Sequence, residues 1–184
     1  MNGNPIAGGG CHPIVLLQPQ TGAALTAQAF HLKEGEHASI GVIFGVEGGS
    51  PAAVPTSIVL NQCTSAAGAN PTAMAFKYYY QLLSGAGNDV LQGVQQILSN
   101  TIGYGPNYAT TSGITTFPAS VAGLQFWIEV DAAELEAIAG VVGPVTEYPY
   151  LQVVVTQNSA SYVCVVGMVT GLRHAELGGY SFTI

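Results

Sequence analysis

Residues 161–173, SYVCVVGMVTGLR, alternate between two faces that are both apolar. One face holds Tyr162, Cys164, Val166, Met168 and Leu172, and the other holds Val163, Val165 and Val169 together with Gly167 and Gly171. This period of two and the many β-branched residues predict a β-strand. Because neither face is polar, we expect the strand to be covered on both sides.

The preceding segment, residues 148–157 (YPYLQVVVTQ), is also rich in Val and Tyr, and a short polar link, Asn158-Ser159-Ala160, joins the two segments. This arrangement predicts an antiparallel hairpin. We expect the Tyr162 face to fill a core with the apolar faces of residues 38–46 and 124–130. The face with Gly167 and Gly171 has no such partner, so we expect residues 101–123 or another subunit to cover it.

Strand patterns recur along the rest of the chain. Further strands are predicted at residues 13–17, 28–32, 38–46, 56–63, 72–83, 124–130 and 176–184. A helix competes at residues 72–83, but strict alternation and the triplet Tyr78-Tyr79-Tyr80 favour a strand. Short strands separated by Gly-rich turns predict an all-β fold, an antiparallel β-sandwich or jelly roll.

One short helix and a long insertion complete the predicted domain organisation. Asp131 and Glu134 have the spacing of a capping box, which predicts a helix over about residues 132–139. Residues 1–27 are predicted to form an N-terminal arm with the first short strand, followed by a single sandwich domain over residues 28–184. Residues 84–123 interrupt that domain as a long loop insertion, of a length that is rare in compact domains.

The composition indicates a protein that is part of an assembly. Only 7% of the residues are charged, against roughly a quarter in a typical soluble domain, while 48% are hydrophobic. A monomer with so few charges has little to keep it from associating. A soluble domain with a Gly- and Ala-rich surface is the alternative.

The scarcity of basic residues argues against two classes of partner. The chain has three Lys and Arg residues and a net charge of −7, so we expect neither nucleic acid nor an anionic membrane surface as a partner. No apolar run has the roughly 18 residues that span a bilayer. The start, MNGNPIAGGG, lacks the features of a secretory signal, so we expect the protein to be made and used without export.

The sequence lacks the motifs of common catalytic and cofactor sites. It contains no nucleophile elbow, Walker loop or dinucleotide fingerprint, so we predict a protein that is not an enzyme and holds no cofactor. The four histidines lack a metal-ligand spacing, and we predict no metal site. Cys11, Cys63 and Cys164 are interpreted as buried thiols, although a disulfide between two of them stays open.

Several aromatic residues are candidates for an interface. Trp127 lies on the polar side of its predicted strand, beside Gln125 and Glu129, so we expect a second layer or a partner to cover it. Tyr104 and Tyr108 lie in the insertion. The predicted interface set is Trp127, Tyr104, Tyr108, Val163, Val165, Gly167, Val169 and Gly171. Such aromatic residues could alternatively form a platform for sugars.

Five segments in order give the chain a resemblance to a known family. They are LKEGEHASIGVIFGV (residues 32–46), the aromatic strand at residues 75–80, FWIEVDAAEL (126–135), YPYLQVVVTQ (148–157) and SYVCVVGMVTGLRHA (161–175). The order resembles the small β-sandwich decoration, cement or minor capsid proteins of tailed bacteriophages. The match runs from about residue 29 to residue 175, and the insertion at 84–123 departs from it.

The resemblance implies a non-enzymatic virion protein. Copies would sit on the exterior of the capsid after synthesis in the host cytoplasm, and would bridge and stabilise subunits of the major capsid protein. Self-association as a homo-oligomer is part of this expectation. The alternative is a carbohydrate- or receptor-binding β-sandwich on a phage tail or fibre.

Overall fold

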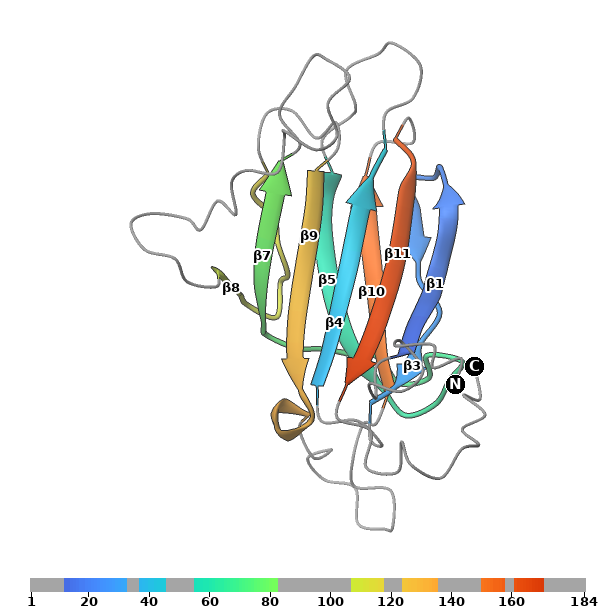
Figure 1. Cartoon of the computed structure of the whole chain (residues 1–184), viewed down its shortest axis with the longest axis vertical. Coiled ribbons are helices and arrows are strands. Elements are labelled where there is room, and N and C mark those ends of the chain that lie inside the picture. Colours follow the sequence, from blue (N-terminus) through green and yellow to red (C-terminus); the bar gives the residue numbers. More distant parts are fainter. Residues whose placement is uncertain are drawn as a thin grey trace, which may run out of the picture.

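The computed structural model describes residues 12–32, 37–45, 55–82, 107–117, 124–135, 150–157 and 161–170. Two antiparallel β-sheets pack face to face, and one 3-10 turn is the helical element of the described residues (Figure 1). The predicted all-β sandwich is therefore confirmed. We call the sheet nearer the viewer in Figure 1 the front sheet and the other the back sheet.

The front sheet has six strands. In spatial order they are β1 (His12–Gln20), β11 (Val163–Thr170), β4 (His37–Phe44), β9 (Leu124–Asp131), β7 (Phe76–Leu82) and β8 (Asn107–Ala109). Every neighbouring pair is antiparallel.

The back sheet has five strands. The order along it is β2 (Ala24–Thr26), β10 (Tyr150–Gln157), β5 (Pro55–Cys63) and β6 (Thr72–Ala73), and β3 (Phe30–His31) also pairs with β10.

The core lies between the two sheets, as the alternation in the sequence predicts. The inner face of the front sheet supplies Ile40, Val42 and Phe44 from β4, Phe126, Ile128 and Val130 from β9, and Val163, Val165 and Val169 from β11, all at most 1% exposed. Phe126 lies at the centre of an aromatic group, with ring centroids 6.1 Å from Phe44 and 5.5 Å from Phe117. Ile58, Leu60, Leu151, Val153 and Val155 face them from the back sheet.

The predicted hairpin of residues 148–173 is wrong. Its two strands, β10 and β11, lie in different sheets, and the chain crosses the sandwich between them. Strand β10 pairs instead with β5, and β11 pairs with β1 and β4. A short polar link allows a crossover between layers as readily as a turn within one layer.

The predicted orientation of β11 is also wrong. Val163, Val165 and Val169 are fully buried, whereas Cys164, Val166 and Met168 are half-buried on the outer face and Tyr162 is exposed. Gly167 lies on the inner face, where an added Cβ would approach Leu16 Cδ1 to 3.0 Å. The absence of a side chain there leaves room for Leu16 of the neighbouring strand and for Phe30 beyond it.

The predicted helix at residues 132–139 is corrected to a single turn. A 3-10 helix covers Ala132–Glu134, and Leu135 already has extended backbone angles; residues 136–139 lie outside the described residues. Glu134 does reach back as predicted, and its Oε2 accepts a hydrogen bond of 3.0 Å from the Asp131 N–H.

Several predicted strands have different boundaries in the structure. Strand β1 extends to Gln20, and residues 24–26, predicted to belong to the N-terminal arm, form β2. The predicted strand at residues 72–83 divides into β6 and β7, because the chain passes from the back sheet to the front sheet at Met74 and Ala75. The predicted strand at residues 176–184 lies outside the described residues.

Part of the predicted insertion at residues 84–123 belongs to the sandwich. Strand β8 pairs with β7, and Ile114 exchanges two backbone hydrogen bonds with Ile58 of the back sheet, at 2.8 and 3.0 Å. Gly113 allows this close approach, because it has a φ of +77° and an added Cβ would lie 2.2 Å from the Ile58 carbonyl oxygen. Residues 107–117 therefore tie the two sheets together at one side.

No helix within the described ranges is long and apolar enough to cross a membrane.

Candidate functional site: the outer face of the front sheet

The outer face of the front sheet carries a continuous apolar surface. Cross-strand pairing aligns Tyr79, Trp127, Gly41, Val166 and Val15 in one row across five strands. Ile43, Cys164 and Met168 lie in the rows on either side. We call Val15, Ile43, Tyr79, Trp127, Cys164, Val166 and Met168 the outer apolar patch; Val15 is 58% exposed and the others are half-buried.

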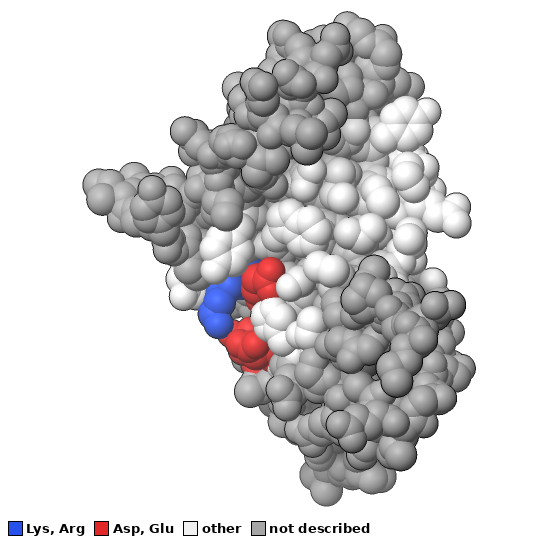
Figure 2. Space-filling model, in the orientation of Figure 1, with Lys and Arg blue, Asp and Glu red and all other residues white. Residues whose placement is uncertain are grey.

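The outer face of the back sheet has a different character. Its pairs between β10 and β5 are Gln152 with Asn61, Thr156 with Ser57, Val154 with Val59 and Tyr150 with Cys63. Two of these four pairs are polar on both strands, a mixed composition that is usual for a sheet face turned to water. The described charged side chains of the front face gather at one place, and the other described residues in that view are uncharged (Figure 2).

Trp127 is held in place by a glycine on the neighbouring strand. A Cβ added to Gly41 would lie 3.0 Å from two atoms of the indole ring and 3.1 Å from a methyl group of Val166. The indole therefore lies over the backbone of β4, in the space that a side chain at Gly41 would fill. This packing fixes the ring on the outer face instead of leaving it free in solvent.

Within the described residues, β1 is one of the two edge strands of the front sheet, and several features disfavour strand addition there. Two of the nine residues of β1, Pro13 and Pro19, have no N–H to offer to a further strand. The carbonyl of Leu16 accepts a hydrogen bond of 2.8 Å from the N–H of Gln28. Addition of a further strand at β1 is therefore disfavoured.

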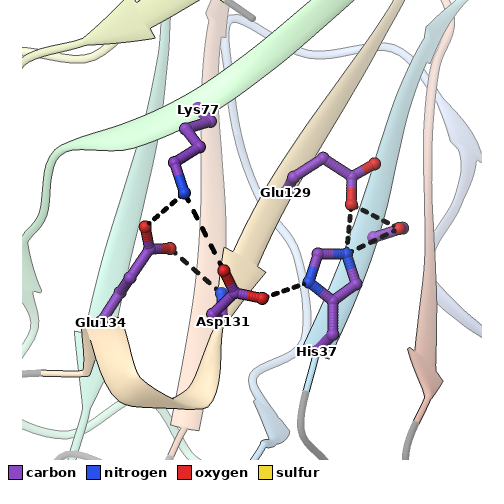
Figure 3. Close-up of polar contacts among 6 residues, drawn as sticks. His37, Lys77, Glu129, Asp131 and Glu134 are labelled. Carbon is purple, nitrogen blue, oxygen red and sulfur yellow. Dashed lines mark hydrogen bonds and ion pairs between the residues drawn. The ribbon is translucent and has the colours of Figure 1, made fainter.

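A polar cluster borders the outer apolar patch. It comprises His37 and Ser39 of β4, Lys77 of β7, Glu129 and Asp131 of β9, and Glu134 of the 3-10 turn (Figure 3). His37 Nδ1 lies 2.7 Å from Asp131 Oδ1, and His37 Nε2 lies 2.5 Å from Glu129 Oε2. Lys77 Nζ lies 2.9 Å from Glu134 Oε1 and 3.8 Å from Asp131 Oδ2. The cluster joins three neighbouring strands on their outer side.

The geometry requires a positively charged His37. Each ring nitrogen faces a carboxylate oxygen, and an ionised carboxylate only accepts hydrogen bonds, so both nitrogens must carry a proton. Partial burial by itself lowers the pKa of His37, but hydrogen bonds to Asp131 and Glu129 and their negative charges outweigh it. The pKa of His37 is consequently raised above its ordinary value.

The cluster resembles a Ser-His-Asp triad only in composition. Ser39 Oγ lies 3.4 Å from His37 Nε2, but it donates its hydrogen bond of 2.6 Å to Glu129 Oε2. The same Glu129 oxygen accepts from His37 Nε2, so that nitrogen has no free lone pair to take a proton from Ser39. This arrangement provides no histidine base for a serine nucleophile.

The cluster does not converge on a metal either. Asp131 and Glu129 contact opposite nitrogens of one imidazole ring, so their oxygens are held apart. In the part of the chain that the structure describes, no group of three or more His, Cys, Asp or Glu residues fits a metal ion.

Two cysteines lie within the described ranges, and both are free thiols. Cys63 is buried in the back sheet, and Cys164 is half-buried on the outer face of β11. Burial raises the pKa of each thiol, which favours the unreactive protonated form. Cys11 lies outside the described residues.

The structure separates the predicted interface residues into three groups. Trp127 is half-buried in the outer apolar patch, and Tyr108 of β8 is 72% exposed. The buried residues Val163, Val165, Gly167 and Val169 belong to the inner face, so they offer no surface to a partner. Tyr104 and Gly171 lie outside the described residues.

Sequence reasoning did not find the polar cluster. Alternation does turn Lys77, Glu129 and Ser39 outward, but it gives no information on which strands are neighbours. The pairs Lys77–Glu129 and Glu129–Ser39 follow from the register of β7, β9 and β4. The available signal was the regular spacing of His37 and Ser39 and of Glu129 and Asp131 on adjacent outward positions.

No known family's sequence model matches the chain, and no curated protein matches it significantly in sequence.

Proposed function

We propose that the chain is a non-enzymatic structural protein of a virus particle. In this proposal it is a decoration protein on the capsid exterior that binds the major capsid protein, and other copies of itself, and is made in the host cytoplasm. The observation that carries the proposal is the outer apolar patch, a fixed uncharged surface on one side of the sandwich. A surface of this kind marks a site of protein association.

Two further features support association through a face. The chain carries 7% charged residues, which leaves little charge to keep copies or partners apart. The edge strand β1 has two prolines, so association by strand addition is disfavoured there. Contacts summed over many copies on a lattice would give strong binding from weak individual sites.

The order of the strands adds a third support. Among the described strands, the first pairs with the last (β1 with β11), β2 and β3 pair with β10, β4 pairs with β9, and β5 pairs with β6. A long antiparallel ribbon that rolls up on itself gives this order, and we extend the proposal to a jelly roll. Jelly rolls are common in viral capsid proteins and in lectins, so the fold alone does not choose between these two functions.

Binding to capsids tests the proposal directly. Capsids of the virus that encodes the chain, assembled without it, should bind the purified protein and show added density on their exterior. Trp127→Ala should weaken this binding about tenfold or more, because a partly buried tryptophan is a typical hot spot. Val154→Ala on the outer face of the back sheet is the control and should bind normally. Density on the tail instead, or no binding, would contradict the proposal.

A carbohydrate-binding function is the second candidate. It is favoured by Tyr79 and Trp127, two aromatic side chains paired on the outer face, with Ser39 and Glu129 in the next row. Sugars bind to such combinations of an aromatic surface with polar groups at its border. A glycan array that gives hits with the native protein and none with Trp127→Ala would favour this function over capsid binding.

A further inference from the structure

The outer apolar patch borders the carboxylate of Glu129, and the described residues form hydrogen bonds with only one of its two oxygens. Glu129 Oε2 accepts hydrogen bonds from His37 and Ser39, at 2.5 and 2.6 Å. Glu129 Oε1 has no hydrogen-bond or ion-pair partner among the described residues, and it points away from the cluster in Figure 3. The side chain is 24% exposed, so this oxygen is already partly withdrawn from water.

A partner that covers Trp127 must also cover Glu129. Both side chains lie on the outer face of β9, two residues apart, which places them roughly 7 Å from each other along the strand. Removing water from an ionised carboxylate is costly unless a donor replaces the water. The partner surface must therefore bring a hydrogen-bond donor to Glu129 Oε1.

The net charge of the described cluster favours a cationic donor. Glu129, Asp131 and Glu134 supply three negative charges, and Lys77 and protonated His37 supply two positive charges. One negative charge is left over at the border of the patch. Arginine matches this position best, because its planar group pairs with carboxylates and also stacks on aromatic rings such as the indole of Trp127.

We infer that the outer apolar patch docks a protein surface that places an arginine against Glu129 and apolar side chains over Trp127 and Val166. The inference rests on the docking face of the proposed function and adds the chemistry of the partner. A second copy of the chain fits this requirement poorly. The chain has three Lys and Arg residues against ten Asp and Glu, and Lys77 is already held by Glu134.

Selection from a displayed library tests the inference without any capsid. The full-length protein is used to select binders from a random library of displayed peptides, and clones that also bind Trp127→Ala are discarded. The remaining clones should be enriched in arginine next to aromatic or aliphatic residues. Enrichment in Asp or Glu, no enrichment in basic residues, or no clone that depends on Trp127 would overturn the inference.

Two variants with the same change in charge locate the contact. Against a selected peptide, Glu129→Gln should weaken binding about tenfold or more, the usual effect of losing a hydrogen bond to a charged group. Glu134→Gln removes the same charge outside the patch and should change binding less than about threefold. Equal effects of the two variants would overturn the inference, because a general effect of net charge would then explain the binding.

The oligomeric state supplies a third result. In sedimentation experiments, Trp127→Ala should leave the oligomeric state of the protein unchanged. If Trp127→Ala instead abolishes self-association of the native protein, the patch is an interface between copies and the inference is wrong. Failure of the capsid-binding experiment can be distinguished from failure of the peptide selection. Selected peptides that depend on both Trp127 and Glu129 would uphold the docking chemistry even if capsids are not bound.

Discussion

The two faces of the front sheet are made of similar residues but have different roles. On strand β9, Phe126 points into the sandwich and is 1% exposed, while the adjacent Trp127 points outward and is half-buried. On β11, Val165 is fully buried and the adjacent Val166 is half-buried. Apolar side chains on one face hold the fold together, and apolar side chains on the other are available to a partner. Four predictions test how sharply the two roles are divided.

The largest expected difference lies between two adjacent aromatic residues. Phe126→Ala should lower the free energy of unfolding by about 3–5 kcal/mol, because the ring is enclosed by Phe44, Tyr78 and Phe117. Trp127→Ala should cost about 1 kcal/mol, since its outer side already faces solvent. Urea unfolding followed by circular dichroism measures both. Equal costs would show that the outer face also belongs to the stabilising core.

A smaller difference is expected between two valines. Val165→Ala should cost about 2 kcal/mol, through loss of buried apolar area and a cavity next to Val42. Val166→Ala should cost less than about 1 kcal/mol. The same unfolding experiment applies. A larger cost for Val166→Ala than for Val165→Ala would support the orientation of β11 that the sequence predicts, in which Val166 faces the core.

Gly41→Ala tests whether the indole of Trp127 depends on the space that Gly41 leaves on β4. The new Cβ would lie 3.0 Å from two indole atoms, so Trp127 must shift outward at a cost of about 1 kcal/mol. The chain contains one tryptophan, so its fluorescence reports this shift without interference. The emission maximum should move to longer wavelength as the ring gains contact with water. An unchanged spectrum would show that the indole does not depend on Gly41.

The smallest effect concerns the charge of His37. Its pKa is raised in the folded protein, so its contribution to stability is fully present below the unfolded pKa of about 6.5 and is lost as pH rises through the folded pKa. His37→Gln should therefore destabilise the protein more at about pH 6 than at about pH 8.5.

Within the described residues, the charged groups around His37 are Lys77, Glu129, Asp131 and Glu134, and Thr170 of β11 is its uncharged neighbour. These groups stay in place in the His37→Gln variant. A difference between wild type and variant that does not change with pH would contradict the protonated state assigned to His37. The pKa measured by NMR titration of His37 gives an independent check.

The strands with one polar and one apolar face were predictable to within a few residues. Ile40, Val42 and Phe44, and likewise Phe126 and Ile128, alternate with polar or small residues, and all five are core residues as expected. Strand β11 was not predictable in this way, because both of its faces are apolar and periodicity cannot choose between them. The choice follows from its neighbours, since Val165 pairs with Val42 and Gly167 leaves space for Leu16.

The candidate site was predictable only in part. Trp127 was singled out because an apolar ring on a polar strand face needs an explanation, and the structure places it at the centre of the outer apolar patch. Its neighbours Tyr79, Val166 and Val15 come from strands far apart in the chain, so no local pattern joins them. The polar cluster is hidden for the same reason.

The sequence by itself determined most of the longer strands, the fold class and the scarcity of charge. These are local or summed properties, fixed by alternation along each strand and by composition. Tertiary structure alone decided that β10 and β11 lie in different sheets, which face of β11 is buried, and that His37 lies between Glu129 and Asp131. Those features depend on which strands become neighbours and in what register, and that depends on packing across the whole sandwich.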